Sequence, residues 1–464
     1  MKKKNLFVMA LAALTFASCS TDDNSGMGEN APDGTAMHAQ LSIRFDENTT
    51  RADGDKDAGN ASEGISDGAT LNVIVYKNDV VENIKTFELA ATETTTASFP
   101  TTAGPKKVVV IANLPADLVA SLPSVNDPIS NLYALQADLV TATPGEVDKI
   151  DVDKKFTMSG IEETTFTVTA GEGDTKDTPL DVPVTINRLA AKINLGIADA
   201  IPRTGILAAD KADVDFVKVA DGSGNKVPPH FALQLTHKYA NILPETKDAF
   251  TSAGTATGDP ATSYGDIVTA DPLSYKTASA DFTTVAYGSS NYCPANYNEN
   301  PETRNSTMAA IKLQLKPKKE MIVTADGSGY KTTYEIATFT DGDFFGFVYK
   351  GVTYAPFSTS AKATAAYEVI NGSAAPAVAV EKWITGLAYY KIYVGDRASD
   401  DPKTKYSVLA NRVYQIKVSS ISGFGSSDEE GIIDPPGPIE KDAHITATIT
   451  VEDWDLVQFS EGNQ

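Results

Sequence analysis

Short segments that alternate apolar and polar residues recur along this chain, and they constrain its fold more than any other feature. The clearest is MHAQLSIRF at 37–45, whose apolar face consists of Met37, Ala39, Leu41, Ile43 and Phe45. Successive side chains of a strand point to opposite faces of a sheet, so this period of two predicts a half-buried β-strand. Similar segments follow at 70–76, 106–113, 155–160 and 165–170. Because long stretches of helical periodicity are nearly absent, we predict an all-β protein.

The first twenty residues, MKKKNLFVMALAALTFASCS, are not expected to belong to the fold. A basic start at 2–4 precedes an apolar run at 6–16 that is too short to span a bilayer, and small residues lead to Cys19. This pattern resembles a bacterial lipoprotein signal, in which Cys19 carries the lipid and becomes the new N-terminus. The residues that follow, Ser20, Thr21, Asp22 and Asp23, resemble an acidic tag that sends some lipoproteins to the cell surface.

The alternating segment at 37–45 is followed by a candidate cleavage site. The sequence DENTTRADGDKDAGNASEG at 46–64 has almost no apolar residues, so it buries too little surface to stay ordered. Arg51, followed by Ala52, is what a trypsin-like protease requires in such a loop. Cleavage there would free the strand at 37–45 from its covalent tether.

The 464 residues are enough for two to four domains, and two are expected after this loop. Strand signals at 66–182 form the first. VPVTINRLAAKINLG at 182–196 predicts the first strand of the second, with a bulge near Arg188 where the alternation changes phase. The polar stretch 240–310 predicts long surface loops on this second domain.

The C-terminal end repeats the pattern of the N-terminal strand. An acidic, proline-rich stretch at 426–443 predicts an extended linker, which at about 3.3 Å per residue reaches roughly 60 Å. A further amphipathic strand follows, with the apolar residues Ile445, Ala447, Ile449, Val451, Trp454, Leu456, Val457 and Phe459. A terminal strand that belonged to the domain before it would seldom need so long a connection. We therefore expect this C-terminal strand to pair outside that domain.

No group of residues predicts catalysis, metal binding or cofactor binding. The four histidines lack zinc-ligand spacing; they are His38, His230, His237 and His444. Cys293 is expected to be buried. The pair Asp341 and Asp343, and the DGSGxK repeats at 221–226 and 326–331, favour hairpin turns over calcium or phosphate loops. The formal charge of −22 disfavours nucleic acid and anionic lipid as partners, because both repel an acidic surface.

The two terminal strands together suggest a mechanism. Removing a strand from a sandwich uncovers an apolar slot with unpaired backbone groups, and the C-terminal strand of another copy can fill it by β-augmentation. Burying four or five apolar side chains at roughly 1.5 to 3 kcal/mol each gives on the order of 10 kcal/mol before entropic costs. Because donor and slot lie at opposite ends of the chain, the contact is head-to-tail and the product is a fibre.

Several segments resemble the major fimbrial subunits, or fimbrilins, of the FimA/Mfa superfamily, which builds type V pili in Bacteroidales. Besides the lipoprotein signal and the Arg51–Ala52 junction, the matching stretches are KKVVVIANLP, KFTMSG, INRLAAKINL, KLQLKPKKE, GLAYYKIYV, LANRVYQIKVSSISGFG and ITATITVEDWD. The resemblance implies two transthyretin-like β-sandwich domains in tandem with a C-terminal donor strand. It also implies palmitate or a similar lipid on Cys19, proteolysis after Arg51 and a donor at about 443–459.

The implied organisation is a signal peptide, a propeptide with a placeholder strand, two sandwich domains, and a linker with the donor, at 1–19, 20–51, 52–182, 183–425 and 426–464. The expected partners are copies of the same chain, accessory fimbrial subunits, an Arg-specific trypsin-like protease and an unidentified surface receptor. The precursor would be an outer-membrane lipoprotein, and the mature subunit would belong to a cell-surface fimbrium.

Two other functions remain open. A surface glycan-binding lipoprotein would use an exposed aromatic platform, for which Tyr389, Tyr390, Tyr393 and Trp383 are candidates, and it would keep its lipid and its N-terminal strand. An accessory fimbrial subunit would lack either the cleavage site at Arg51 or the C-terminal donor strand, since an anchor keeps its lipid and a tip needs no donor strand. An enzyme has only unassigned acidic pairs in its favour.

Overall fold

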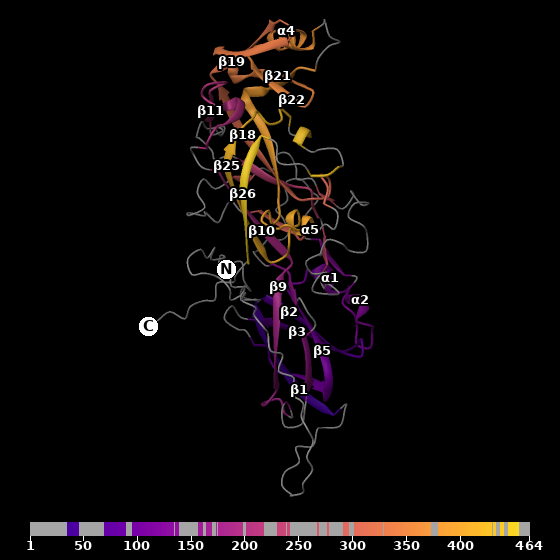
Figure 1. Cartoon of the computed structure of the whole chain (residues 1–464). Coiled ribbons are helices and arrows are strands. Elements are labelled where there is room, and N and C mark those ends of the chain that lie inside the picture. Colours follow the sequence, from indigo (N-terminus) through magenta and orange to yellow (C-terminus); the bar gives the residue numbers. More distant parts are fainter. Residues whose placement is uncertain are drawn as a thin grey trace, which may run out of the picture.

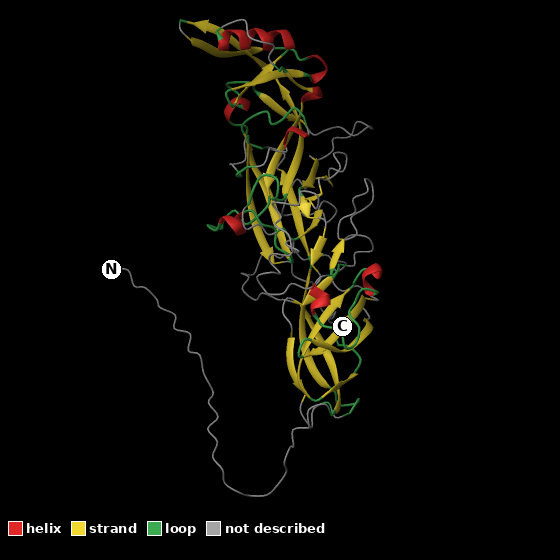
Figure 2. Ribbon diagram, turned by 90° about the vertical axis from the view of Figure 1, so that its right-hand side faces the viewer, coloured by secondary structure: helices red, strands yellow, loops and turns green. Residues whose placement is uncertain are grey.

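The computed structural model describes residues 35–45, 69–89, 95–133, 135–138, 156–160, 164–168, 173, 175–197, 201–217, 230–237, 239–241, 267–268, 276–277, 291–296, 301–327, 329–372, 379–428, 430–432, 437–439 and 444–453. This part of the chain is elongated and consists mainly of strands that run along its length (Figures 1 and 2). It forms an N-terminal domain, a C-terminal domain and a smaller unit at the far end. No helix in the described residues is both long and apolar enough to cross a membrane.

The N-terminal domain is built on one sheet of eight strands. In spatial order these are β3 (Val80–Leu89), β2 (Ala69–Lys77), β5 (Gly104–Ala112), β7 (Met158–Gly160), β9 (Leu180–Arg188), β1 (Ala36–Phe45) and β4 (Phe99–Thr102), with β8 (Thr164–Val168) beside β5. The short helices α1 (Ala116–Val119) and α2 (Ser130–Tyr133) follow β5. The two ends of the order meet, since Asn83 of β3 donates to the carbonyl of Pro100 in β4. The sheet therefore closes around its own apolar core.

The C-terminal domain is a sandwich of two sheets. One has the order β17 (Asn291–Pro294), β10 (Ala190–Ile197), β25 (Arg412–Ile421) and β26 (Ile445–Asp453). In the other, β18 (Met308–Pro317) pairs with β11 (Val214–Val217), β12 (His230–Gln234) and β24 (Leu387–Tyr393), and β16 (Lys276–Thr277) pairs with β12. Apolar residues of both sheets pack between them, which makes an all-β protein of two domains.

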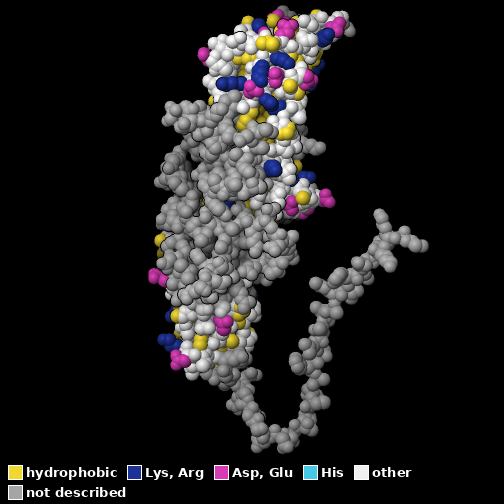
Figure 3. Space-filling view, turned by 90° about the vertical axis from the view of Figure 1, so that its left-hand side faces the viewer, with side chains coloured by type: hydrophobic (Ala, Val, Ile, Leu, Met, Phe, Trp, Pro, Cys, Tyr) yellow, Lys and Arg dark blue, Asp and Glu magenta, His cyan; other side chains and the backbone are white. Residues whose placement is uncertain are grey.

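A smaller unit at 319–383, called the distal unit here, is inserted between β18 and β24 and lies at the top of Figure 1. It contains β19 (Lys319–Asp326), β20 (Gly329–Ile336), β21 (Phe344–Tyr349), β22 (Val352–Phe357), β23 (Glu381–Trp383) and α4 (Ser360–Asn371). On the face drawn in Figure 3, basic and acidic side chains are interspersed over the described surface of this unit. The net negative charge is therefore not concentrated in one patch on that surface.

Besides the pair β19 and β20, the two-stranded sheets of the described residues are β13 (Thr236–His237) with β15 (Ile267–Val268), and β14 (Tyr239–Asn241) with β6 (Gln136–Asp138). Turns of 3-10 helix are η3 (Gly205–Leu207), η5 (Thr340–Gly342), η6 (Ile384–Gly386) and η7 (Glu430–Ile432), and α5 is Pro402–Lys405. Because β6 belongs to the first half of the chain and β14 to the second, their pairing joins the two domains.

The chain passes between the domains later than the sequence suggested. Residues 182–188, expected to open the second domain, belong to β9, which pairs with β1 and β7 of the first sheet. The second domain begins at Ala190, where β10 pairs with β17 and β25. The change of phase in the apolar–polar alternation near Arg188 thus marks the point where the chain crosses from the sheet of the N-terminal domain to that of the C-terminal domain. Arg188 is buried there, and its guanidinium donates to the side-chain oxygen of Asn411 at 3.2 Å.

Two other expectations also need correction. Residues 291–310, expected to be surface loop, supply β17 and buried polar residues such as Asn296, whose amide donates to the hydroxyl of Thr307 at 2.9 Å. The helix α4 was not anticipated, although its Ala-rich sequence favours helix. Thr359 caps its first turn by accepting from the Lys362 amide, and Gly372 ends it with a φ of 73°.

Candidate functional site: the slot of β1 and the C-terminal strand

The strand β1 lies between β9 and β4 in the sheet of the N-terminal domain. It runs parallel to β9 from Ala39 to Phe45 and antiparallel to β4 from Ala36 to Ala39. We call the space that it fills, between β9 and β4, the slot. In the described part of the chain, β4 pairs with β1 alone, and residues 180–185 of β9 also pair only with β1. The removal of β1 would therefore open backbone ladders on both sides of the slot.

The inward face of β1 is the face predicted from the sequence. Its buried residues are Met37, Ala39, Leu41 and Ile43, none of which is more than 3% exposed. All four belong to the apolar core of the domain. Phe45 ends the strand, and its side chain lies outside the described residues.

Loops of the same domain hold the backbone of β1. The Leu41 amide donates to the Thr96 hydroxyl and the Leu41 carbonyl accepts from the Thr96 amide, both at 3.0 Å. The His38 amide donates to the Gly173 carbonyl at 2.6 Å. Gly173 has a φ of +83°, and a Cβ there would lie 2.3 Å from the His38 carbonyl oxygen. Only glycine fits so close to β1.

The other predicted features of the N-terminal segment cannot be placed. Cys19, Arg51 and Ala52 lie outside the described residues, as does the whole of 46–68 between β1 and β2. Lipidation at Cys19 and cleavage after Arg51 therefore stay predictions.

The C-terminal strand β26 lies on its own domain. It pairs antiparallel with β25 along Ile445–Asp453 as the last strand of that sheet. Ile445 and Ile449 are buried, while Ala447 and Val451 are half-buried. The expectation that this strand has no place in its own domain is wrong for the single chain. Trp454, Leu456, Val457 and Phe459 lie outside the described residues.

The predicted linker is also packed against the domain where it is described. Ser426 and Tyr389 exchange two backbone hydrogen bonds of 2.9 Å, and Lys391 donates to the carbonyl of Ile432 at 3.0 Å. Further along, the Thr303 amide donates to the Gly437 carbonyl at 2.9 Å. These contacts hold Ser426, Ile432 and Gly437 against the domain in the single chain.

The aromatic residues proposed for a glycan platform do not form one. Tyr390, Tyr393 and Trp383 are buried, and each donates to a backbone carbonyl, those of Gly423, Thr303 and Phe424 respectively. Burial raises the pKa of the Tyr390 phenol far above its usual value. Tyr389 is half-buried, with the Lys312 ammonium 5.6 Å from its ring centre. These residues serve the core and the docking of 426–432.

The remaining sequence candidates have structural roles where they are described. Cys293 is buried on β17. The repeat at 326–331 is the hairpin turn between β19 and β20, as predicted, whereas that at 221–226 lies outside the described residues. Among the residues that the structure describes, no three His, Cys, Asp or Glu side chains are grouped as a metal site would require. The side chains of His230 and His237 lie outside that set.

The turn at Asp341 and Asp343 is not a hairpin, because β20 and β21, which it connects, belong to different sheets. Asp343 accepts from the Thr385 amide at 2.7 Å and pairs with Lys382 at 2.6 Å. These bonds lower the pKa of the Asp343 carboxyl. The carboxylate thus links η5 to η6.

At the start of β26, His444 is packed against Gly423, where an added Cβ would lie 2.1 Å from the His444 Nδ1. The backbone carbonyl of His444 accepts from the Ser422 amide at 2.8 Å. Burial lowers the pKa of the imidazole below its ordinary 6.5. The docked C-terminal strand therefore favours the neutral histidine.

Two family models match this sequence. One, the major fimbrial subunit protein FimA, covers residues 39–188, from β1 to the end of β9. The other, the C-terminal region of fimbrillin, the major fimbrial subunit protein type IV, covers residues 381–458, from β23 through β26. The chain belongs to the family of major fimbrial subunits, the fimbrilins. This family consists of structural subunits of fimbriae, and not of enzymes.

Solved structures with a similar course of the chain include a fimbrilin from Porphyromonas gingivalis W83, with 18% identity, 91% of this chain and 98% of that chain covered, and a TM-score of 0.49. A cell adhesion protein from Parabacteroides distasonis matches at 18% identity, with 91% and 100% covered and a TM-score of 0.47. The tip fimbrial protein Mfa3 from Porphyromonas gingivalis matches at 12% identity, with 91% and 100% covered and a TM-score of 0.37. Among curated proteins, none matches this fimbrilin.

Proposed function

We propose that this fimbrilin is the shaft subunit of its fimbria and that it polymerises by donor-strand exchange. The precursor is exported as a lipoprotein on Cys19, an Arg-specific protease cleaves after Arg51, and β1 then leaves the slot. The C-terminal strand of a second copy enters the slot and takes the place of β1. The observation that carries the proposal is the position of β1 between two strands that both lie beyond the cleavage site.

The inward residues of the two strands support the exchange. From the N-terminal end, β1 presents Met37, Ala39, Leu41 and Ile43, and β26 presents Ile445, Ala447, Ile449 and Val451. Each pair is a swap between apolar residues of similar volume, and alanine is second in both strands. Such volume-conserving swaps usually cost less than about 1.5 kcal/mol. We therefore propose that Ala447 occupies the place of Ala39.

The energetic balance requires a cost on the donor side. In the single chain β26 is paired with β25, so its release breaks that ladder and exposes Ile445 and Ile449. In the slot, burial of Ile445 and Ile449 offsets their exposure on release, so the net apolar gain comes from Ala447 and Val451, which are half-buried on β25. That gain is at most about 1.5 to 3 kcal/mol for the larger of the two, Val451. The slot also offers backbone pairing on two sides, to β9 and β4, whereas among the described strands β26 pairs only with β25. An interior slot is thus a better site for this strand than a sheet edge.

The direction of assembly follows from the domain positions. The slot belongs to the N-terminal domain and β26 to the C-terminal domain, so each subunit donates from one domain and accepts in the other. Such a contact does not close on itself, and it produces a fibre. A chain with both a cleavable propeptide and a donor fits the shaft better than the anchor, which keeps its lipid, or the tip, which needs no donor.

Two variants test the proposal in cells. Arg51→Ala should leave a lipidated precursor that does not polymerise, while Lys56→Ala, in the same loop, should assemble normally. Truncation after Lys441 should give cleaved subunits without fibres. Electron microscopy and boiling-resistant ladders report assembly, and intact mass reports processing. Normal fibres from the truncated chain would reject the donor assignment, and an N-terminus at Cys19 on surface protein would favour a glycan-binding lipoprotein.

A further inference from the structure

The wall of the slot formed by β4 needs a support other than β1. Among the described strands, β4 pairs only with β1, so strand exchange removes its whole backbone ladder before the donor arrives. Residues before it are affected too, since Thr96 bonds to Leu41 of β1. If β4 moved at that moment, the slot would lose one side. The structure contains a polar network that bears on this step.

Side chains of β3 bond to the edge of β4 that faces away from β1. Successive residues of a strand direct their backbone groups to alternate edges, and Ala103 donates to Thr35 on the β1 side. Pro100 and Thr102 therefore face the other way. The Asn83 amide donates to the Pro100 carbonyl at 2.6 Å, and the Thr102 amide donates to the Glu82 carboxylate at 3.0 Å. Asn83 and Glu82 thus take the place of a neighbouring strand.

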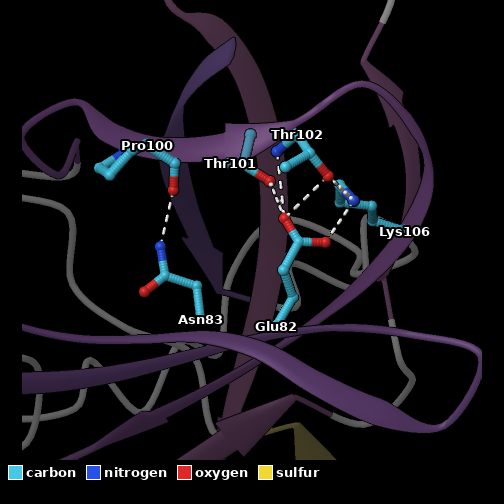
Figure 4. A network of polar contacts seen from close by, with 6 residues as sticks. All are labelled: Glu82, Asn83, Pro100, Thr101, Thr102 and Lys106. Atoms are coloured by element: carbon cyan, nitrogen blue, oxygen red, sulfur yellow. Dashed lines mark hydrogen bonds and ion pairs between the residues drawn. The ribbon is translucent and has the colours of Figure 1, made fainter. Parts of the chain in front are cut away.

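Glu82 and Lys106 extend this network to β5. The same Glu82 oxygen accepts from the hydroxyls of Thr101 and Thr102 at 3.2 and 3.1 Å, and its other oxygen pairs with the Lys106 ammonium (Figure 4). Lys106 also donates to the Thr102 hydroxyl at 2.6 Å. Its side chain is 0% exposed, and that of Glu82 is 20% exposed. Each of these bonds joins β3, β4 or β5, so all of them survive when β1 leaves.

A buried ion pair is not an efficient means of stabilising a core. Removing two charges from water is costly, and well-packed apolar residues of similar volume are often as stabilising or better. The pair instead fixes the position of β4, because the Glu82 carboxylate accepts from one backbone amide and two hydroxyls of that strand at once. This argues for a role in holding β4 rather than for a role in stability alone.

We infer that Glu82 and Lys106 are positioning residues of the polymerisation site. They hold β4 in place in the cleaved subunit, so that the slot keeps both walls for the C-terminal strand of a second copy. They also occupy the outer edge of β4, which directs an incoming strand to the slot and not to that edge. The inference rests on the proposed strand exchange and adds the residues that keep the acceptor open.

The experiment compares the full chain before and after cleavage. The double variant Glu82→Met, Lys106→Met removes both charges together, so neither is left buried without its partner. Thr86→Ala is the matched control, because Thr86 lies on the same strand and donates to Asn72 of β2, away from β4. Asn83→Ala, which removes only the bond to Pro100, serves if the double variant does not fold.

Two quantities are measured on each protein. Hydrogen exchange of peptides that cover 95–103 reports how firmly β4 is held, in the precursor and after trypsin cleavage and displacement of β1. The uptake of a labelled synthetic peptide of residues 443–459 by the cleaved subunit reports acceptance of the donor. We expect the precursor of the double variant to match wild type within about twofold in exchange, because β1 still pairs with β4 there. After cleavage, we expect exchange in β4 at least tenfold faster and donor uptake at least tenfold slower than in wild type or Thr86→Ala.

The inference is overturned if the cleaved double variant takes up the peptide within twofold of wild type. It is also overturned if β4 in the cleaved wild-type subunit exchanges as fast as an unfolded chain. A different result would reject strand exchange itself: a cleaved wild-type subunit that takes up no peptide although β4 stays protected. The last result distinguishes failure of the proposed function from failure of the role given to Glu82 and Lys106.

Discussion

Leu41→Ala should weaken the precursor and leave the fibre unchanged. Leu41 is 0% exposed in the core of the N-terminal domain. Replacing a buried leucine by alanine removes its transfer free energy and leaves a cavity, which together cost about 2 to 5 kcal/mol. A domain of this size loses roughly 2 to 4 °C in Tm per kcal/mol, so a cost of about 3 kcal/mol corresponds to about 6 to 12 °C.

The fibre responds differently because β1 is absent from it in the proposed mechanism. We expect polymers of Leu41→Ala subunits to dissociate in hot detergent at the same temperature as wild type. Ile186→Ala is the matched control, since Ile186 is equally buried in the same core but lies on β9, which the mature subunit keeps. That variant should lower both the Tm of the precursor and the dissociation temperature of the polymer.

The assay is calorimetry or circular dichroism for the precursor and a temperature series of detergent gels for the polymer. A fall in the polymer dissociation temperature with Leu41→Ala, as large as that with Ile186→Ala, would refute the reasoning. It would mean that β1 remains in the assembled sheet.

Three other predictions follow from the same geometry. Gly173→Ala places a Cβ 2.3 Å from the His38 carbonyl at a φ of +83°, so it should lower the precursor's free energy of unfolding by about 1 to 3 kcal/mol, as urea denaturation would measure. Ala447→Leu, at a half-buried position of β26, should change precursor stability little but slow polymerisation strongly, because the tight place of Ala39 would have to accept three more carbons; an unchanged polymerisation rate would contradict the register. The docking of β26 should weaken on acidification. Burial lowers the pKa of His444 when β26 is docked on β25. Above pH 6.5 the imidazole is neutral in both the docked and the released strand, so docking has its full stability. As pH falls below 6.5 and through the lower pKa of the docked state, the released strand binds the proton more readily and docking loses stability. The protection factors of amides in 445–453, which correct for the intrinsic pH dependence of amide exchange, should fall between pH 7.5 and 5 in wild type and not in His444→Gln.

The strands that could be predicted from the sequence are those with one buried face or a continuous apolar run. The segment 37–45 became β1 within one residue, and 70–76 and 106–113 became β2 and β5. In each, alternation or a run of β-branched residues reports burial directly. The strand β3 was missed because it is half-exposed over much of its length and its pattern is weak.

The domain crossing and the support of β4 could not be predicted, for a different reason. Arg188 marks a change of phase, which a bulge and a passage between sheets produce equally. Lys106 and Lys107 are adjacent in KKVVV, yet only Lys106 is buried against Glu82. The sequence alone does not show that Lys106 pairs with Glu82, because the two residues lie on different strands, β5 and β3. The docking of β26 on β25 also depends on a long-range pairing that its own residues do not specify.

The central claim is that the slot of one subunit is filled by the C-terminal strand of another. Fibres assembled from a mixture of light and heavy isotope-labelled subunits, cross-linked at short range and analysed by mass spectrometry, test it most directly. We expect subunits that begin at Ala52 and cross-links between 443–459 of one isotope and β4 or β9 of the other. Cross-links of that segment only to β25 of the same isotope, in subunits that still contain Met37 to Phe45, would contradict it.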